Sequence, residues 1–259
     1  MYNSILLDIN NVVGTITLNR ADVFNAFNDE QSYELQDALK QVAKNDEVRV
    51  VVLTGAGKAF CSGQDLKAIS GAEKRSLEDS LHKRYNPIIR AMRNLPKPII
   101  ARVNGVAAGA GCSLALASDI IVAAESAKFI EVFVNVGLVL DSGSSYFLPR
   151  LVGSARAFEM STMASRITAQ QALDWGMINK VAPDAELDAA VQVYTDYYRS
   201  APTKAIAMMK KMLNKSFQSD LDTMLDYEAH CQQIAGNSDD YREGVKAFNE
   251  KRKPEFRGK

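Results

Sequence analysis

Two short runs of apolar, mostly β-branched residues stand out in the hydrophobic pattern of the chain. Residues 48–54 and residues 99–103 each combine valines or isoleucines over a short stretch, which is typical of buried strands. A turn containing glycine and alanine follows each run, at residues 55–66 and 104–113. We expect each turn to lead into a helix, with small residues where bulk would block close approach.

The positions around these runs predict an alternation of strands and helices. Asn28-Asp29-Glu30-Gln31 resembles a capping box that opens a helix, and Asn10-Asn11 indicates a turn between two strands of a hairpin. The pair Pro96 and Pro98 forces extended chain before residue 99. Further predicted strands cover residues 5–10, 12–18 and 119–124, and further predicted helices cover residues 76–95 and 109–118. This alternation predicts an α/β fold with a layered, largely parallel sheet.

The pattern changes after about Asp141, where successive helices are expected. They cover residues 154–163, 169–175, 185–198, 203–217, 221–235 and 239–251, and only residues 177–181 interrupt them as a strand. The last three helices carry substantial apolar faces. Helices of this kind must cover the core or a neighbouring subunit. We therefore divide the chain into a core, residues 1–200, and a C-terminal helical region, residues 201–259.

Composition excludes several classes of protein. The 259 residues include 31 basic and 31 acidic side chains, so the formal net charge is zero. This charge balance does not favour binding to nucleic acid or to an anionic membrane. No apolar run is long enough for a membrane span, and the first residues lack the pattern of a signal peptide. The three cysteines and two histidines show no metal-ligand spacing. We expect a cytoplasmic protein without a metal site.

Chemistry without a side chain is possible at the two glycine turns. The entrance of a helix carries free backbone N–H groups that can face a bound oxygen. Two such entrances, brought together, could hold one oxygen that gains negative charge during a reaction. The alternative is that both turns only connect a strand to a helix and have no chemical role.

One carboxylate is the leading candidate for proton transfer. No Walker-type loop, dinucleotide fingerprint or serine elbow is present. Asp141 follows Leu138-Val139-Leu140, and apolar surroundings would raise its pKa and suit it to shuttle a proton. Its alternative role is to cap a helix that begins at Ser142. Glu131 is a rival carboxylate, which a partly exposed strand position explains equally well.

Several motifs, taken in order, resemble those of the crotonase (enoyl-CoA hydratase/isomerase) family along essentially the whole chain. They are Thr17-Leu18-Asn19-Arg20 with Asn25-Ala26, residues 59–66, Pro96-Lys97-Pro98, residues 104–111, Ser118-Asp119-Ile120, residues 148–153 and residues 172–176. The resemblance implies an α/β fold built as a spiral of ββα turns, with a C-terminal helical region that mediates trimerisation. It also implies trimers, often paired into hexamers, and a coenzyme A thioester as substrate. Coenzyme A then belongs to the substrate, and no separate cofactor is expected.

The resemblance also implies the residues of the site. The oxyanion donors of the family fall on the backbone N–H groups of Gln64 and Ala110, and Asp141 lies where several isomerases of the family carry their acid/base. The implied substrate-binding residues are Asn25, Ala26, Ala59, Ser62, Gly63, Asp65, Leu66, Gly109, Gly111, Ser113 and Phe133. The adenine end of coenzyme A is expected near residues 59–65, with Asn25 and Ala26 beside it.

Departures from the family pattern indicate the reaction. Hydratases of the family use two glutamates, and this chain has Ser113 and Phe133 at those positions. A single carboxylate, Asp141, suffices for a 1,3-proton shift. Residues 85–87, Gly137-Leu138 with Asp141, and residues 240–245 with Gly258-Lys259 further resemble the isomerases of phenylacetate breakdown. We therefore expect an acyl-CoA isomerase that shifts a double bond or opens the epoxide of phenylacetyl-CoA. The alternatives are a hydratase that uses Glu131 and a non-catalytic acyl-CoA binding protein.

Overall fold

A six-stranded sheet is the larger of the two sheets in the fold. The computed structural model describes residues 2–69 and 76–259. The sheet has the order β1-β2-β3-β5-β7-β10, and all its neighbouring strands are parallel except the hairpin of β1 and β2. Its strands are β1 (Ile5–Asn10), β2 (Val13–Leu18), β3 (Val50–Gly55), β5 (Ile99–Val103), β7 (Ile120–Ala124) and β10 (Lys180–Ala182). The predicted parallel layer and its hairpin are confirmed.

A second, smaller sheet was not predicted from the hydrophobic pattern. Its order is β4-β6-β8-β9, and only the last pair is antiparallel. The strands are β4 (Ala59–Cys61), β6 (Val106–Ala108), β8 (Lys128–Ile130) and β9 (Ile167–Thr168). The chain repeatedly passes from the large sheet to the small sheet and then into a helix, as in β5, β6 and α5 (Ala110–Leu116). The ββα spiral that the resemblance implied is therefore confirmed.

The first long helix begins where its capping residue predicts. In α1 (Asp29–Lys44) the Asn28 side chain accepts the backbone N–H of Gln31, which satisfies one free donor of the first turn. The Gln31 side chain donates to the Ser4 carbonyl at 3.4 Å, so only one of the two hydrogen bonds of a capping box is formed. Helix α9 (Leu187–Arg199) packs across β3, β5, β7 and β10.

The predicted helix over residues 76–95 is broken into three pieces. They are α3 (Leu77–Ser80), the π-helical segment η2 (Leu81–Tyr85) and α4 (Asn86–Asn94). Pro87 has no N–H to donate to the preceding turn, and the Gln36 side chain donates instead to the carbonyls of Lys83 and Arg84, each at 3.0 Å. The widened turn leaves the side chains of Arg84 and Tyr85 buried.

The remaining helices follow the ranges expected for the second half of the chain, except the helix before residue 154, which those ranges did not include. They are α6 (Ser144–Val152), α7 (Ser154–Met163), α8 (Ala169–Asp174), α10 (Thr203–Ser216), α11 (Leu221–Gly236) and α12 (Asp239–Asn249). Short helical segments are α2 (Leu66–Ile69), η1 (Ala21–Val23), η3 (Val132–Val136) and η4 (Asp184–Glu186). No helix in the described ranges has the length and apolarity needed to cross a bilayer.

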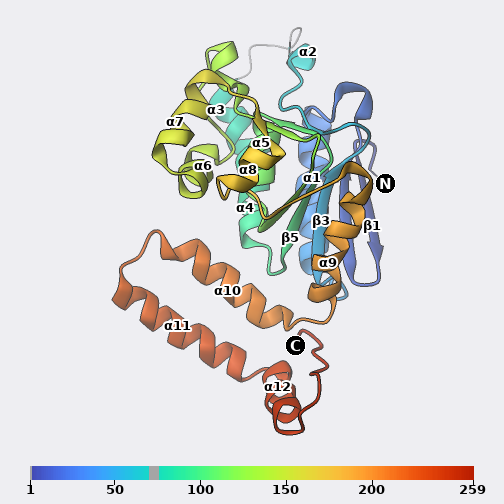
Figure 1. Cartoon of the computed structure of the whole chain (residues 1–259), viewed down its shortest axis with the longest axis vertical. Coiled ribbons are helices and arrows are strands. Elements are labelled where there is room, and N and C mark those ends of the chain that lie inside the picture. The colour runs from blue at the N-terminus through green and yellow to red at the C-terminus, as the bar shows by residue number, and fades with distance from the viewer. Residues whose placement is uncertain (1, 70–75) are drawn as a thin grey trace.

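The last three helices extend from one end of the molecule, below the sheets in Figure 1. A buried ion pair joins α10 to the core, because the Lys210 ammonium donates to Asp119 Oδ2 at 2.7 Å and to the Lys97 carbonyl at 3.2 Å. Burial lowers the pKa of Lys210, and the Asp119 charge opposes that shift. Asn214 on α10 also accepts from Arg93 at 3.0 Å.

Loss of the Lys210 ammonium should loosen this attachment. Lys210→Met leaves Asp119 with one buried cation fewer, so we expect the free energy of unfolding to fall by about 2–4 kcal/mol. Lys211, which is exposed on the same helix, provides the control. Lys211→Met should change the free energy of unfolding by less than about 0.5 kcal/mol. Urea denaturation measures both, and equal effects would show that the pair does not dock α10.

Candidate active site

A cavity of about 820 Å³ opens between the two glycine turns, the segment that includes α3 and η2, and the chain from η3 to Asp141. Most of its wall is apolar. The apolar lining includes Leu66, Leu77, Leu81, Val132, Phe133, Val136, Leu138, Val139 and Leu140. Two of the three predicted catalytic residues, Gln64 and Ala110, line it through the glycine turns, and the third, Asp141, lines it from the loop before α6.

Close backbone packing brings the two glycine turns together. Residues 62–66 and 109–113, the second parts of these turns, follow β4 and β6, which are adjacent and parallel, so both leave the same edge of the small sheet. A Cβ atom added to Gly63 would lie 2.9 Å from the Ala108 carbonyl oxygen and 3.6 Å from the Ala110 nitrogen. One added to Gly111 would lie 2.2 Å from the Cys61 carbonyl oxygen. Only glycine allows this approach at either position.

Two backbone N–H groups at this junction are left without a backbone acceptor among the described residues. Phe27 bridges to the turn by donating to the Gly63 carbonyl at 2.7 Å and accepting from Asp65 at 2.9 Å. The N–H of Gln64, between them, takes no part in that bridge. Ala110 is the first residue of α5, where an N–H has no partner within its own helix. Both residues line the cavity, and neither N–H is used by a backbone acceptor in the part of the chain that the structure describes.

Asp141 lies half-buried in the cavity wall beside Leu140. Burial raises the pKa of its carboxyl group above the ordinary range, against the lowering effect of a 2.7 Å hydrogen bond from the Ser142 hydroxyl. The capping alternative is wrong: α6 begins at Ser144 after Gly143, and no side chain caps it. The Ser144 N–H donates to the backbone carbonyl of Asp141 at 3.0 Å, and not to its side chain.

Tyr85 lies between the glycine turns and the carboxylate. Its hydroxyl donates to Gln64 Oε1, and its ring meets Phe27 edge-on with centroids 5.6 Å apart. Burial raises the pKa of the phenol; the Arg84 cation opposes this, and the Asp141 charge adds to it. Periodicity could not single out this tyrosine, because its inward position depends on the π-helical turn.

Glu131 is fully buried at 0% exposure, so the expectation of a partly exposed strand position is wrong. It lies behind the cavity wall rather than in it, although its neighbours Val132 and Phe133 line the cavity. Burial raises the pKa of Glu131 to about 7; hydrogen bonds from Ser144 and Cys112 oppose this shift, and the Asp141 charge adds to it. Its Oε1 accepts from the Ser144 hydroxyl at 2.8 Å.

The substrate-binding residues that the resemblance implied fall into two groups. Those that line the cavity are Ser62, Gly63, Leu66, Gly109 and Phe133. Those that lie outside it are Asn25, Ala26, Ala59, Asp65, Gly111 and Ser113. Two residues of the second group, Asn25 and Asp65, hold the first glycine turn in place. The Asn25 side chain donates to the carbonyls of Ala56 and Ala59, and Asp65 pairs with Arg20 at 2.9 Å.

A polar end of the cavity was missed by the sequence reasoning. Asp29, Glu30 and Arg84 line it, and Arg84 pairs with Asp29 at 2.6 Å. No signal in the pattern links these residues, because Asp29 opens α1 while Arg84 lies on η2. Across residues 2–69 and 76–259, no group of three or more His, Cys, Asp or Glu side chains is arranged to hold a metal ion.

Comparison with known proteins decides the family. The model of the enoyl-CoA hydratase/isomerase family matches residues 8–259. The chain belongs to this family of enzymes.

Individual relatives agree with this assignment over their full lengths. The chain is 44% identical to the 1,2-epoxyphenylacetyl-CoA isomerase of Escherichia coli, with 100% of each chain covered. It is 41% identical to a probable enoyl-CoA hydratase of Rhodobacter capsulatus, covering 100% of this chain and 99% of that one. A crystal structure of a putative enoyl-CoA hydratase/isomerase from Mycobacterium abscessus superimposes with a TM-score of 0.93 at 34% identity, covering 98% of this chain and 100% of the other.

The close contact between Gly111 and the Cys61 carbonyl can be tested by substitution. Gly111→Ala should lower the free energy of unfolding by about 2–3 kcal/mol, because its Cβ would collide with the Cys61 carbonyl. Turnover should fall at least about tenfold, because the shift moves the Ala110 N–H relative to Gln64. Gly236→Ala is the matched control in α11, since a Cβ there meets no atom within 4 Å. Thermal unfolding and initial rates measure the two effects; unchanged stability in Gly111→Ala would contradict the packing argument.

Burial of Glu131 yields a second test, in the pH dependence of stability. An acid with a raised pKa holds its proton more tightly in the folded state, so stability falls as pH rises from its ordinary value of 4.5 through about 7. Glu131→Gln removes this dependence. Relative to the wild type, the variant should gain about 2–4 kcal/mol between about pH 4.5 and pH 8.

Chemical denaturation at several pH values measures this difference. Glu125→Gln is the control, because Glu125 is exposed and its removal should leave the pH dependence unchanged. Parallel stability curves for Glu131→Gln and the wild type would show that Glu131 is not held neutral by burial.

Proposed function

We propose that the protein is an acyl-CoA isomerase that moves a proton within a coenzyme A thioester by way of an enolate. The observation that carries the proposal is the composition of one cavity. It combines the half-buried carboxylate of Asp141, an apolar wall and two backbone donors at Gln64 and Ala110. A thioester enolate needs a base of raised pKa and charge stabilisation on oxygen, and the cavity offers both.

The reaction proceeds in two steps at one carboxylate. The Asp141 carboxylate takes a proton from C2 of a 3-enoyl thioester, and the electron pair of that C–H bond moves through the carbonyl carbon onto oxygen. The N–H groups of Gln64 and Ala110 donate to the resulting enolate oxygen. When the enolate reverts, the double bond moves to C2–C3 and C4 takes the proton back from Asp141. Atoms and charge balance without any other acid, base or cofactor.

Hydration would require a second carboxylate facing the cavity to activate water. Ser113 and Phe133 occupy the positions that the hydratase resemblance assigns to glutamates, and neither carries a carboxyl group. Glu131 does not line the cavity, which counts against its use as that second group. These observations favour an isomerase over the hydratase alternative, and membership in a family of enzymes counts against a non-catalytic binding protein.

We further propose two substrate classes that share this enolate chemistry: 3-enoyl-CoA thioesters and the epoxide of phenylacetyl-CoA. The Escherichia coli relative that is 44% identical is named for the second class. The aromatic rings of Tyr85 and Phe133 in the lining suit a cyclic acyl group as well as a chain. Segment 59–65 remains the proposed location for the adenine end of coenzyme A.

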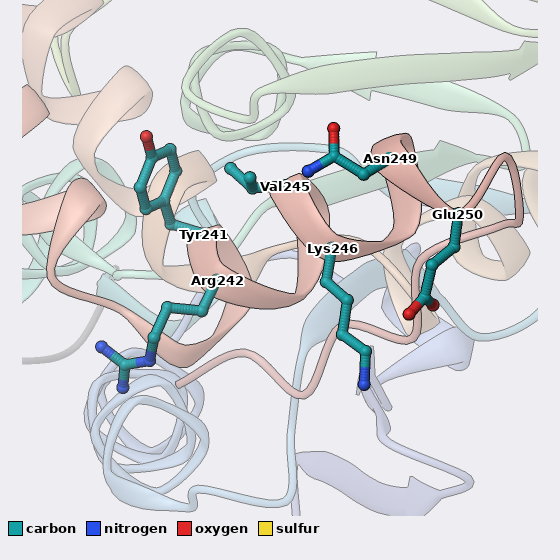
Figure 2. A pocket seen from close by; sticks show the side chains of 6 residues that line it. All are labelled: Tyr241, Arg242, Val245, Lys246, Asn249 and Glu250. Atoms are coloured by element: carbon teal, nitrogen blue, oxygen red, sulfur yellow. The ribbon is translucent and has the colours of Figure 1, made fainter.

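Self-association through residues 201–259, into a trimer or a dimer of trimers, is also proposed. Large apolar side chains remain exposed on the last three helices: Leu213, Phe217, Leu221, Leu225, Tyr241, Val245 and Phe248. Residues of α12 line a hollow of about 520 Å³. In Figure 2, Tyr241, Val245 and Asn249 project to one side of this helix and Lys246 to the other. Exposed apolar area of this kind favours a protein partner.

Asp141→Asn tests the proposed base. The amide cannot take a proton from carbon, so turnover of both substrate classes should fall about 10²–10⁴-fold, while calorimetry should still detect binding of the thioester. Asp46→Asn is the matched control, because Asp46 is exposed and does not line the cavity, and it should retain turnover. Equal rates for wild type and Asp141→Asn would remove Asp141 from the mechanism.

A further inference from the structure

A buried chain of oxygen atoms connects Glu131 to the proposed base. Glu131 Oε1 lies 2.8 Å from the Ser144 hydroxyl, and that hydroxyl lies 2.7 Å from the hydroxyl of Ser113. The Ser113 hydroxyl in turn lies 3.1 Å from the backbone carbonyl oxygen of Asp141. Glu131, Ser113 and Ser144 are each 0% exposed, so no bulk water replaces a missing partner.

The number of protons in this chain depends on Glu131. Each serine hydroxyl has one proton to donate. If Glu131 is ionised, the Ser144 proton goes to the carboxylate and the Ser113 proton goes to Ser144, so neither hydroxyl reaches the Asp141 carbonyl. If Glu131 is protonated, it donates to Ser144 and Ser144 donates to Ser113, which frees the Ser113 proton for the backbone carbonyl of Asp141 at 3.1 Å. This carbonyl is the nearer of two acceptors, the other being the Gly109 carbonyl at 3.2 Å. Only the protonated acid allows one continuous chain ending at Asp141.

The orientation of Asp141 depends on these main-chain contacts. Its backbone carbonyl accepts from the Ser144 N–H at 3.0 Å as well as from the Ser113 hydroxyl. These two donors come from α6 and α5 respectively. With the carbonyl held from both helices, the side chain of Asp141 is held in the cavity wall, where a displacement of about 1 Å would cost much of the rate.

We propose that protonated Glu131 is a positioning residue for Asp141, acting through the hydroxyls of Ser144 and Ser113 without touching the substrate. The proposal rests on the proposed function of Asp141. It assigns a role in catalysis to a carboxyl group outside the cavity, and it gives Ser113 a part in that role other than binding substrate.

The groups that face Glu131 set the pH at which this chain breaks. They are the Cys112 thiol on α5, the Ser144 hydroxyl on α6 and the Asp141 carboxylate. The thiol stays neutral, because burial raises the pKa of Cys112 well above its ordinary value. Ionisation of Glu131 above about pH 7 removes the donor of the chain and places a second negative charge near Asp141. Turnover should therefore fall as Glu131 ionises.

The experiment measures kcat and KM against pH for 3-enoyl-CoA isomerisation. In the wild type we expect kcat to rise as Asp141 ionises and to fall again above about pH 7. In Glu131→Gln the falling limb should disappear, because the amide N–H₂ donates to Ser144 at every pH. In Glu131→Leu, which has no donor, kcat should be reduced about tenfold to a hundredfold with KM within about twofold of wild type. Glu125→Gln, an exposed carboxylate, should keep the wild-type profile.

A spectroscopic readout checks the protonation of Glu131 without substrate. The infrared carbonyl band of a protonated carboxyl group should titrate in the wild type with a midpoint near pH 7 and be absent from Glu131→Gln. Ser113→Ala tests the chain at its other end, and it serves in place of Glu131→Leu if that variant fails to fold. It should lower kcat as Glu131→Leu does.

The outcomes separate this inference from the proposed function. If Asp141→Asn is inactive while Glu131→Leu and Ser113→Ala keep the wild-type kcat and pH profile, the positioning role is overturned and the proposed base stands. A falling limb that persists in Glu131→Gln also overturns it. If Asp141→Asn turns over normally, the proposed function itself fails.

Discussion

The approach of two backbone turns to within van der Waals contact is the constraint on which the rest of the site depends. Gly63 meets the Ala108 carbonyl and Gly111 meets the Cys61 carbonyl at distances that exclude any side chain. Parallel pairing of β4 with β6 brings the turns to the same edge of the small sheet. The N–H groups of Gln64 and Ala110 therefore lie together on one cavity wall, placed by the backbone alone.

Two carboxyl groups near this wall illustrate how the same physical cause can lead to different roles. Burial raises the pKa of both Asp141 and Glu131. Asp141 lines the cavity with an apolar neighbour, whereas Glu131 lies behind the wall with a serine hydroxyl as its partner. Exposure to the cavity suits the first to exchange protons with a ligand. Enclosure fits the positioning role proposed for the second.

Elements with a clear local pattern were predicted well, and those without one were not. The strand over residues 99–103 and the helix over residues 154–163 have the predicted bounds. Strands β4, β6, β8 and β9 contain only two or three residues, too few for alternation to show, so the pattern missed the second sheet. The predicted helix over residues 76–95 is helical over residues 77–94, but a π-helical turn at residues 81–85 interrupts its α-helical hydrogen bonding next to Pro87.

The sequence by itself determined the strands of the large sheet, the glycine turns and the family, because β-branched runs, small residues and ordered motifs are local properties of a chain. It also gave Asp141 as the candidate for proton transfer, but left open whether the residue caps a helix. Only the tertiary structure decided that α6 begins at Ser144, that Tyr85 turns inward and that Glu131 is enclosed. Burial and the identity of a hydrogen-bond partner depend on segments distant in the chain, and a local pattern carries no information about them.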